Sequence, residues 1–221
     1  MRETGSLLDL AAIEASLLAV QHHFAVLNGL LEEPRDPFVD LVRNNMLEGY
    51  ALVDRLARQG VDIFDLQNLD WMIEINNVVL CGSDPARRLE YIKHVQATQE
   101  RFYSDSEGGG IHALYEWYQA HAEDSVWKRA AGAFVRILSK PQLFIEGNHR
   151  SASLIASLLL VREGHPPFVL TTENAAGFFN PASVVRRLPK NGMVALFRFP
   201  KIKKRYAEFL KAQSDRRFLK I

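Results

Sequence analysis

The sequence predicts a mostly α-helical fold. Apolar residues recur at spacings of three and four along most of the chain, which is the period of an amphipathic helix. Asp-Pro pairs and single glycines separate these apolar runs, as they do where helices begin and end. Strand-like alternation is scarce, so at most a small β-hairpin is expected beside the helices.

Helix start and stop signals divide the first half of the chain. Residues 7–31 suit one long helix or two short ones. The segment that follows has Asp36 as N-cap, Pro37 at the first helical position and Gly60 as its stop. Residues 84–103 repeat this device with a second Asp-Pro pair.

The second half of the chain continues the helical pattern. Further helices are expected over 108–121, 125–140, 154–164, 180–190 and 200–216, with a short extended piece at 166–171. Only residues 74–82 and 192–199 have strand-like composition. A hairpin or isolated extended segments would accommodate them.

Composition limits the classes of function. The chain has 221 residues, of which 48% are hydrophobic, enough for one large domain or a domain with an appendage. A net charge of +1 provides no global attraction to nucleic acid or to an anionic membrane. The single cysteine, Cys81, excludes an intramolecular disulfide, and its apolar neighbours predict a buried thiol.

No membrane span or signal peptide is expected. We find no apolar stretch close to the roughly 20 residues that a span requires. The N-terminal segment carries Glu3, Asp9 and Glu14 among its apolar residues, unlike a signal peptide. A soluble cytoplasmic protein of bacterial type is therefore expected, with no membrane partner.

The segment QLFIEGNHRSAS, residues 142–153, is the most unusual in the chain. It places a glycine turn between an apolar run and a strongly apolar helix. The free amides of a first helical turn attract anions, Gly147 permits close approach, and Arg150 adds a forked cation suited to phosphate. Glu146 could coordinate Mg²⁺ beside a phosphate. A purely structural turn, with Asn148 as N-cap and a surface pair of Glu146 and Arg150, is the alternative.

These residues resemble the signature loop of the Fic/Doc (Fido) family. That signature runs His, any, Phe, any, Asp or Glu, Gly, Asn, Gly, Arg, two of any, Arg. The matching positions are Phe144, Glu146, Gly147, Asn148 and Arg150. The resemblance covers residues 110–170, including the apolar helices before and after the loop, and it implies a Fic/Doc-like helical bundle.

The resemblance also implies a function. Fic loops bind the phosphates of ATP, or of another nucleotide, together with Mg²⁺. The family transfers AMP or another phosphate-containing group to a hydroxyl of a protein target. Phosphate contacts would fall on Gly147, Asn148, His149 and Arg150, and Mg²⁺ on Glu146.

Three departures from the signature qualify this expectation. The family's catalytic base aligns with Gln142, whose amide cannot accept a proton near pH 7. The second family glycine aligns with His149, where Doc-type proteins also carry a large residue. The last family arginine aligns with Ser153. His149, with an ordinary pKa near 6.5, could act as a displaced acid–base group. A catalytically inactive module that binds an anion, a nucleotide or a protein is the alternative.

A second element, NNMLEGY at residues 44–50, is similar to the inhibitory helix of many Fic proteins. Asn44 stands where the family has Ser or Thr, and Glu48 is followed by Gly49 as in the motif. The family's partner arginine is absent at Ser153, so Arg150 or His149 would have to receive Glu48. A Glu-Gly pair is also common in ordinary helices.

Two other clusters favour structural roles. The basic run 201–205 suits a solvated helix face, because Tyr206, Phe209 and Leu210 at helical spacing predict packing on the other side. Nucleic acid is therefore not expected as a partner. Among the aromatic residues 115–119, core packing of Trp117 is favoured over a stacking surface.

The expected organisation has two parts. Residues 1–60 would form an N-terminal helical region that carries the inhibitory-type helix, and residues 61–221 a Fic-like domain with C-terminal helices. A flap that aligns the target is sought at 74–82 or near Gly108. Homodimerisation, the target and the transferred group stay open.

Overall fold

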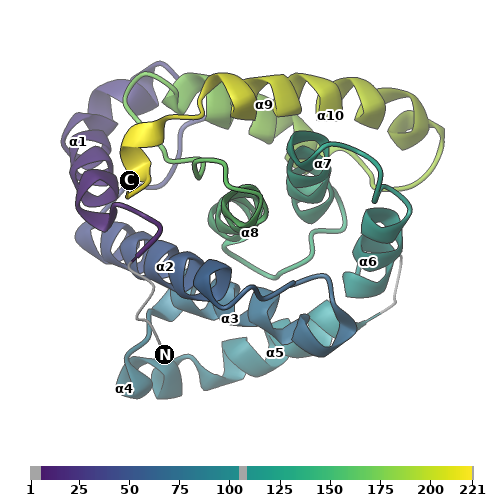
Figure 1. Cartoon of the computed structure of the whole chain (residues 1–221), viewed down its shortest axis with the longest axis horizontal. Helices are drawn as coiled ribbons and strands as arrows, with labels where there is room; N and C mark the ends of the chain where they lie inside the picture. Colours follow the sequence, from purple (N-terminus) through teal and green to yellow (C-terminus); the bar gives the residue numbers. More distant parts are fainter. Residues whose placement is uncertain (1–5, 105–108, 221) are drawn as a thin grey trace.

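The computed structural model describes residues 6–104 and 109–220, and this part of the chain is mostly α-helical (Figure 1). The fold class predicted from the sequence is confirmed. Between residues 6–104 and 109–220 the helices are α1 (Leu10–Gly29), α2 (Asp40–Arg58), η1 (Leu66–Asn68), α3 (Asp70–Cys81), α4 (Pro85–Glu90), α5 (Ile92–Tyr103), α6 (Ile111–Gln119), α7 (Val126–Leu138), α8 (Asn148–Arg162), α9 (Ala175–Arg187), α10 (Met193–Ala212) and η3 (Arg216–Phe218).

Helix α8 is the centre of the fold. It lies in the middle of the molecule with the other helices arranged around it (Figure 1). Every residue from 151 to 161 is buried, as expected for a helix that is apolar on all sides. Helices α7, α2 and α3 pack directly against it. The loop that precedes α8 therefore opens onto the most buried helix of the protein.

Gly49 brings α2 close to α8. A Cβ atom at this position would lie 2.4 Å from Cδ1 of Leu154. Any larger residue would push the two helices apart. The glycine of the predicted inhibitory motif thus has a packing reason that is independent of inhibition.

Helix α1 corrects one expectation about membranes. By length and composition its residues Leu10–Gly29 could cross a membrane, whereas we had expected no such stretch. Polar residues scattered along this helix interrupt its apolar residues, so the segment does not form a continuous apolar stretch. In the fold, its inner face packs into the protein core through Ile13, Leu17 and Val20. A core helix passes the same length and composition test, so the finding is weak evidence for a membrane.

The two candidate strands are helical, which corrects the sequence prediction. Residues 74–82 fall almost entirely in α3, and residues 192–199 form the start of α10. α3 is buried on several sides, and a helix without a polar stripe resembles a buried strand in sequence. In the described residues only isolated bridges occur, Leu8 with Leu219 and Lys140 with Pro189. The flap candidate at 74–82 is therefore not a hairpin, and Gly108 lies outside the described residues.

Several helix boundaries also differ from prediction. α2 begins at Asp40 with Val39 as its N-cap, so Asp36 and Pro37 lie in the preceding loop. The predicted helix over 84–103 divides at Tyr91 into α4 and α5.

The last two helices begin earlier than expected. α9 and α10 contain Pro181 and Pro200 within them, although these prolines suggested starts. A proline signals a start only where the upstream residues cannot form a turn, and here they can.

The predicted packing roles are confirmed. Tyr206 and Leu210 are buried on the inner side of α10, and Trp117 packs against the core while half-buried. Cys81 is fully buried, and burial raises the pKa of its thiol. Buried residues of the first 60 positions share one hydrophobic core with the rest. The division at residue 60 stays a prediction.

Candidate functional site

The loop before α8 is closed by side-chain hydrogen bonds of Asn148. Its Oδ1 accepts the backbone N–H of Phe144 at 2.9 Å, and its Nδ2 donates to the carbonyl of Phe144 at 2.8 Å. The same Nδ2 lies 3.4 Å from Oε1 of Gln142. Asn148 is buried and is the first residue of α8. Its side chain therefore closes the loop and does not act as the N-cap.

The turn itself needs glycine. Gly147 has φ +73°, in the left-handed region, and caps α8 without a side chain. A Cβ here would lie 3.0 Å from Nδ2 of Asn76. That amide donates to the carbonyl of Glu146 and to Oγ of Ser151, both at 2.9 Å. Asn76 of helix α3 therefore fixes this turn through its hydrogen bonds to Glu146 and Ser151.

The first amides of α8 are available to a ligand. The backbone N–H groups of Asn148, His149 and Arg150 donate to no acceptor among the described residues, and the first bond runs from Ser151 to the carbonyl of Gly147. Such groups at a helix start attract anions. Anion binding by these amides stays a prediction.

A cavity of about 290 Å³ adjoins this helix start. Gly147, Asn148, His149 and Arg150 line it, as predicted for phosphate contact. Residues of α1, α2, α9 and the loop before α2 complete the walls. Much of the remaining lining is apolar and aromatic, with Leu17, Phe24, Phe38, Phe178 and Phe179. We call the part of the cavity around His149 and its arginines the cationic end, and the part lined by Phe24 and Phe38 the apolar end.

Three arginines surround His149 at the cationic end. Arg35, Arg186 and Arg150 all line the cavity and all lower the pKa of His149, although burial is the largest cause. Together these effects bring that pKa to about 3. His149 is therefore neutral at pH 7, and its Nε2 is buried without a hydrogen-bond partner among the described residues.

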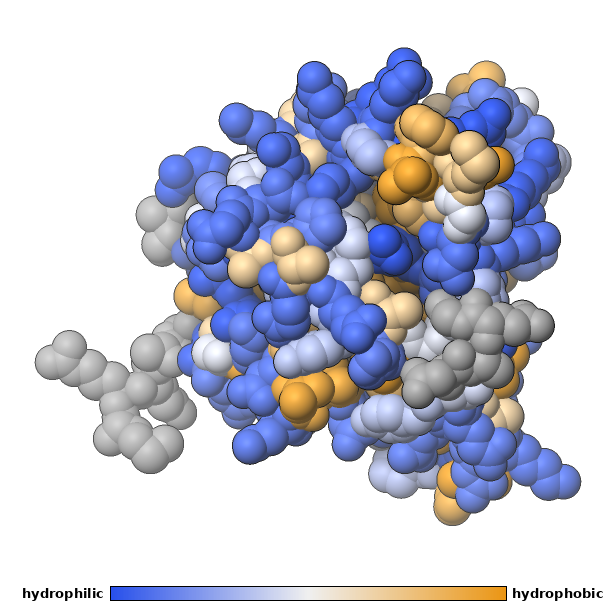
Figure 2. All heavy atoms as spheres, turned by 90° about the vertical axis from the view of Figure 1, so that its right-hand side faces the viewer, coloured by the Kyte–Doolittle hydropathy of each residue, from blue (hydrophilic) through white to orange (hydrophobic). Residues whose placement is uncertain are grey.

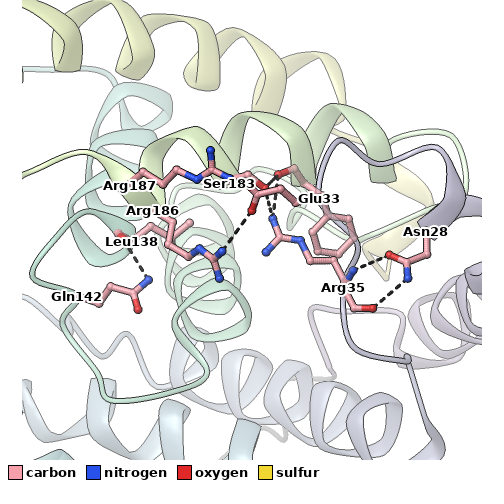
Figure 3. Close-up of polar contacts among 9 residues, drawn as sticks. Asn28, Glu33, Arg35, Leu138, Gln142, Ser183, Arg186 and Arg187 are labelled. Atoms are coloured by element: carbon pink, nitrogen blue, oxygen red, sulfur yellow. Dashed lines mark hydrogen bonds and ion pairs between the residues drawn. The ribbon is translucent and has the colours of Figure 1, made fainter.

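Hydrogen bonds and an ion pair hold these arginines in place, and Figure 3 shows those of Arg35 and Arg186. Arg35 donates to the carbonyl of Phe179 and makes a short hydrogen bond to Ser183. Arg186 pairs with Glu33 at 3.2 Å. Arg150 donates from Nη1 to the carbonyl of Val79 at 2.9 Å, and burial lowers its pKa. These contacts leave other guanidinium N–H groups for a ligand.

Sequence analysis missed Arg35, Asp36 and Arg186 as site residues. Arg35 and Asp36 lie more than 100 positions from the loop, and Asp36 was assigned a capping role that the structure does not support. Asp36 is the carboxylate at the rim, and it acts electrostatically on Arg35 and Arg150. A single arginine before an Asp-Pro pair, and an arginine pair near the end of a helix, are too common as patterns to mark these residues.

Gln142 lies apart from this cavity. Its Nε2 donates to the carbonyl of Leu138 at 3.2 Å (Figure 3). It lines a neighbouring cleft of about 690 Å³ that also contains Arg101, Lys140, Arg186 and Arg187. Arg186 borders both spaces and links the base position of the signature to the cationic end of the first cavity.

Two further predicted residues lie outside the cavity. Glu146 is exposed and acts electrostatically on Arg150 but does not line the cavity. Within residues 6–104 and 109–220, no group of three His, Cys, Asp or Glu side chains could hold a metal ion. Mg²⁺ often binds through one or two carboxylates and the phosphates of its ligand, so the role of Glu146 stays a prediction.

The carboxylate of Glu48 is engaged elsewhere. Its Oε2 accepts the backbone N–H and Oγ–H of Ser83, both at 2.7 Å. Ser153, at the position of the family's last arginine, donates to the carbonyl of His149 at 2.8 Å. The inhibitory role of Glu48 stays a prediction, and this geometry places its carboxylate on the turn after α3.

Comparison with known proteins finds one distant structural likeness. No family model matches the chain, and no curated protein sequence matches it. Among solved structures, the chain is similar to "Fic-1 (aa134 - 508) from C. elegans", with 18% sequence identity and a TM-score of 0.44. The match covers 96% of this chain and 63% of that chain. A helical protein that carries the Fic name is thus a distant structural neighbour of this one.

Proposed function

We propose that the cavity at the start of α8 binds the phosphate groups of a nucleotide. The observation that carries the proposal is the convergence of Arg35, Arg150 and Arg186 on one end of the cavity. They come from three separate parts of the chain and meet beside three free backbone amides. Guanidinium groups and helix-start amides are the usual partners of phosphate.

The apolar end of the cavity suits the remainder of a nucleotide. Phe24 and Phe38 lie with ring centroids 5.9 Å apart, and both line the cavity. Aromatic side chains of this kind provide a stacking surface for a base. Because His149 is neutral beside the arginines, it adds no further positive charge to the buried site before an anion binds.

Transfer of AMP through the usual base is not proposed. Gln142 cannot accept a proton, and its amide is already occupied by Leu138 and Asn148. Loss of a positioned base costs about 10²–10⁴-fold in rate. A nucleotide-binding protein with little or no AMP transfer is therefore the first candidate.

A phosphotransferase or nucleotidyltransferase that uses His149 is the second candidate. The observation in its favour is the unpartnered Nε2 of a histidine that lines the cavity. A protein hydroxyl would attack a phosphorus of the nucleotide. Attack on the terminal phosphorus would release the nucleoside diphosphate, and attack on the α-phosphorus would release pyrophosphate. The hydroxyl proton would pass to the imidazole. A bound phosphate would raise the pKa of His149 and make it a better base.

The binding test uses isothermal titration with ATP and Mg²⁺ on the whole chain. Arg186→Gln should weaken binding about tenfold or more, because a charge-assisted hydrogen bond contributes about 1.5–3 kcal/mol. Arg187→Gln is the matched control, since Arg187 also pairs with Glu33 but does not line the cavity. Equal binding by both variants, or no binding by the wild type at millimolar ATP, would reject the proposal.

The transfer test separates the two candidates. Mass spectrometry after incubation with ATP and Mg²⁺ should show no self-modification of the wild type if the protein only binds. Modification gained by Gln142→His would indicate a transfer site silenced at one position. Modification of the wild type that is lost in His149→Gln would favour the second candidate.

A further inference from the structure

A second cavity, of about 390 Å³, lies between α6, α7 and the start of α10. Its lining shares no residue with the cavity at the start of α8. Trp117, Arg136, Lys190, Leu196, Phe199 and Lys203 are the lining residues that matter here. Three of these six carry a positive charge, and the other three are apolar.

Lys190 is a buried amine that has no carboxylate partner within residues 6–104 and 109–220. Its side chain is only 6% exposed, and its Nζ has a single long contact, 3.4 Å from the carbonyl of Gly109. The charged groups that act on it are the cations Arg101 and Arg136. Burial, and then these two cations, lower its pKa to about 7.

Arg136 is the second cation without an anionic partner. Its guanidinium lies over the ring of Trp117, 5.1 Å from the centroid, and its side chain makes no hydrogen bond among the described residues. Burial lowers its pKa to about 10. Gly132 admits the Trp117 ring, since a Cβ there would lie 1.9 Å from Cη2.

The third cation of the cavity has a carboxylate partner. Lys203 lies over the same ring at 5.6 Å, and its Nζ donates to Oδ2 of Asp124 at 2.8 Å. Among the residues that the structure describes, Lys190 and Arg136 have no such partner. Buried charges are usually paired, because an unpaired one loses its hydration without replacement.

From this arrangement we infer a second ligand site, in which a small organic anion binds with its acidic group between Lys190 and Arg136. The carboxylate, sulfonate or phosphate group would provide the missing counter-charge. The apolar body would lie against Trp117, Leu196 and Phe199. The inference does not rest on nucleotide binding at α8.

The surface around the cavity favours a ligand with an apolar body. Met193, Leu196 and Phe197 at the start of α10 are 75%, 70% and 66% exposed. The face of the molecule on that side shows an apolar patch next to hydrophilic side chains (Figure 2). A purely inorganic anion would leave this apolar surface in water.

The first experiment compares two fluorescent probes. 1-Anilinonaphthalene-8-sulfonate carries an aromatic body and an acidic group, and N-phenyl-1-naphthylamine carries the same body without charge. The sulfonate should bind the whole chain more tightly. Lys190→Met and Arg136→Met should each weaken its binding about tenfold or more and leave the neutral probe within about twofold.

Two controls make this result specific. Lys128→Met removes a cation of α7 that is 52% exposed and does not line the cavity, so sulfonate binding should not change. Arg186→Gln tests the other cavity, and weakened sulfonate binding there would place the probe at α8 and overturn the inference. Equal loss of both probes in Lys190→Met would show apolar binding alone, which also overturns it. Circular dichroism checks that each variant is folded.

Proton uptake gives an independent readout. A bound anion favours the charged amine, so binding of the sulfonate at pH 8 should take up as much as about one proton. Calorimetry in buffers of different ionisation enthalpy measures this uptake. It should vanish at pH 5.5, where the amine is already charged, and in Lys190→Met at pH 8. Uptake that persists in Lys190→Met would place the proton on a group other than Lys190 and would count against the inference.

Discussion

The amide of Asn148 bonds both backbone polar groups of Phe144, at 2.9 Å to its N–H and 2.8 Å to its carbonyl. One side chain thus closes the loop between α7 and α8 by imitating the two sides of a peptide bond. Both residues are buried, so no water can replace these hydrogen bonds at low cost.

Asn148→Ala should lower the free energy of unfolding by about 2–4 kcal/mol, because it leaves two buried backbone groups of Phe144 unsatisfied. Urea unfolding followed by circular dichroism measures the change. Glu146→Ala is the control in the same loop, since Glu146 is exposed and its side chain makes no hydrogen bond among the described residues; it should change stability by less than about 0.5 kcal/mol. Similar losses of stability in the two variants would show that the hydrogen bonds between Asn148 and Phe144 contribute little to the free energy of unfolding.

Gly147→Ala should destabilise the protein more than Gly164→Ala, by about 1 kcal/mol or more. Both glycines have positive φ, +73° and +77°, so the backbone cost is shared. Only Gly147 faces a close neighbour, Nδ2 of Asn76 at 3.0 Å, whereas Gly164 has nothing within 4 Å. Thermal unfolding of the two variants isolates the cost of the steric contact with Asn76. Equal decreases in Tm would contradict this prediction.

His149 should make the protein less stable in acid. Its pKa in the folded state is about 3, against about 6.5 when unfolded. Below pH 6.5 the unfolded chain therefore takes up a proton that the folded protein excludes. Stability should fall as pH decreases from about 6.5 towards 3, by at most about 1.4 kcal/mol per pH unit from this residue. In His149→Gln, urea midpoints between pH 4 and 7 should fall less steeply than in the wild type. An unchanged slope would show that His149 is not buried neutral.

Asp54→Ala should cost about 3–5 kcal/mol of stability. Its Oδ1 accepts the backbone N–H groups of Leu7 and Leu8 at 2.7 and 2.9 Å, and its Oδ2 pairs with Arg58 at 2.9 Å. The carboxylate therefore ties the segment before α1 to α2 from a buried position.

Asp40→Ala is the matched comparison for this prediction. Asp40 also pairs with an arginine of α2, Arg43 at 3.2 Å, but its side chain is 78% exposed. Its removal should cost about 0.5 kcal/mol or less. The difference between the two variants in urea unfolding measures the effect of burial, and comparable losses would count against it.

Local sequence patterns predicted the helical class, most helix positions and the glycine turn before α8. Local patterns suffice for these features, because capping, helical period and glycine turns depend on residues a few positions apart. The same locality explains the two wrong strand predictions. α3 is buried on several sides and lacks a polar stripe. The start of α10 is a short apolar run with a composition that suits a strand as well as a helix, although most of its large apolar side chains are exposed.

Only the tertiary structure decided how the site is composed. It brought Arg35 and Arg186 to His149, separated Gln142 from the cavity and engaged Glu48 with Ser83. It also placed the buried Lys190 near the partly buried Arg136, with no counter-charge for either among the described residues. These relationships join residues tens to more than a hundred positions apart, and no local pattern records which side chains the packing of helices will bring together or which charges it will remove from water.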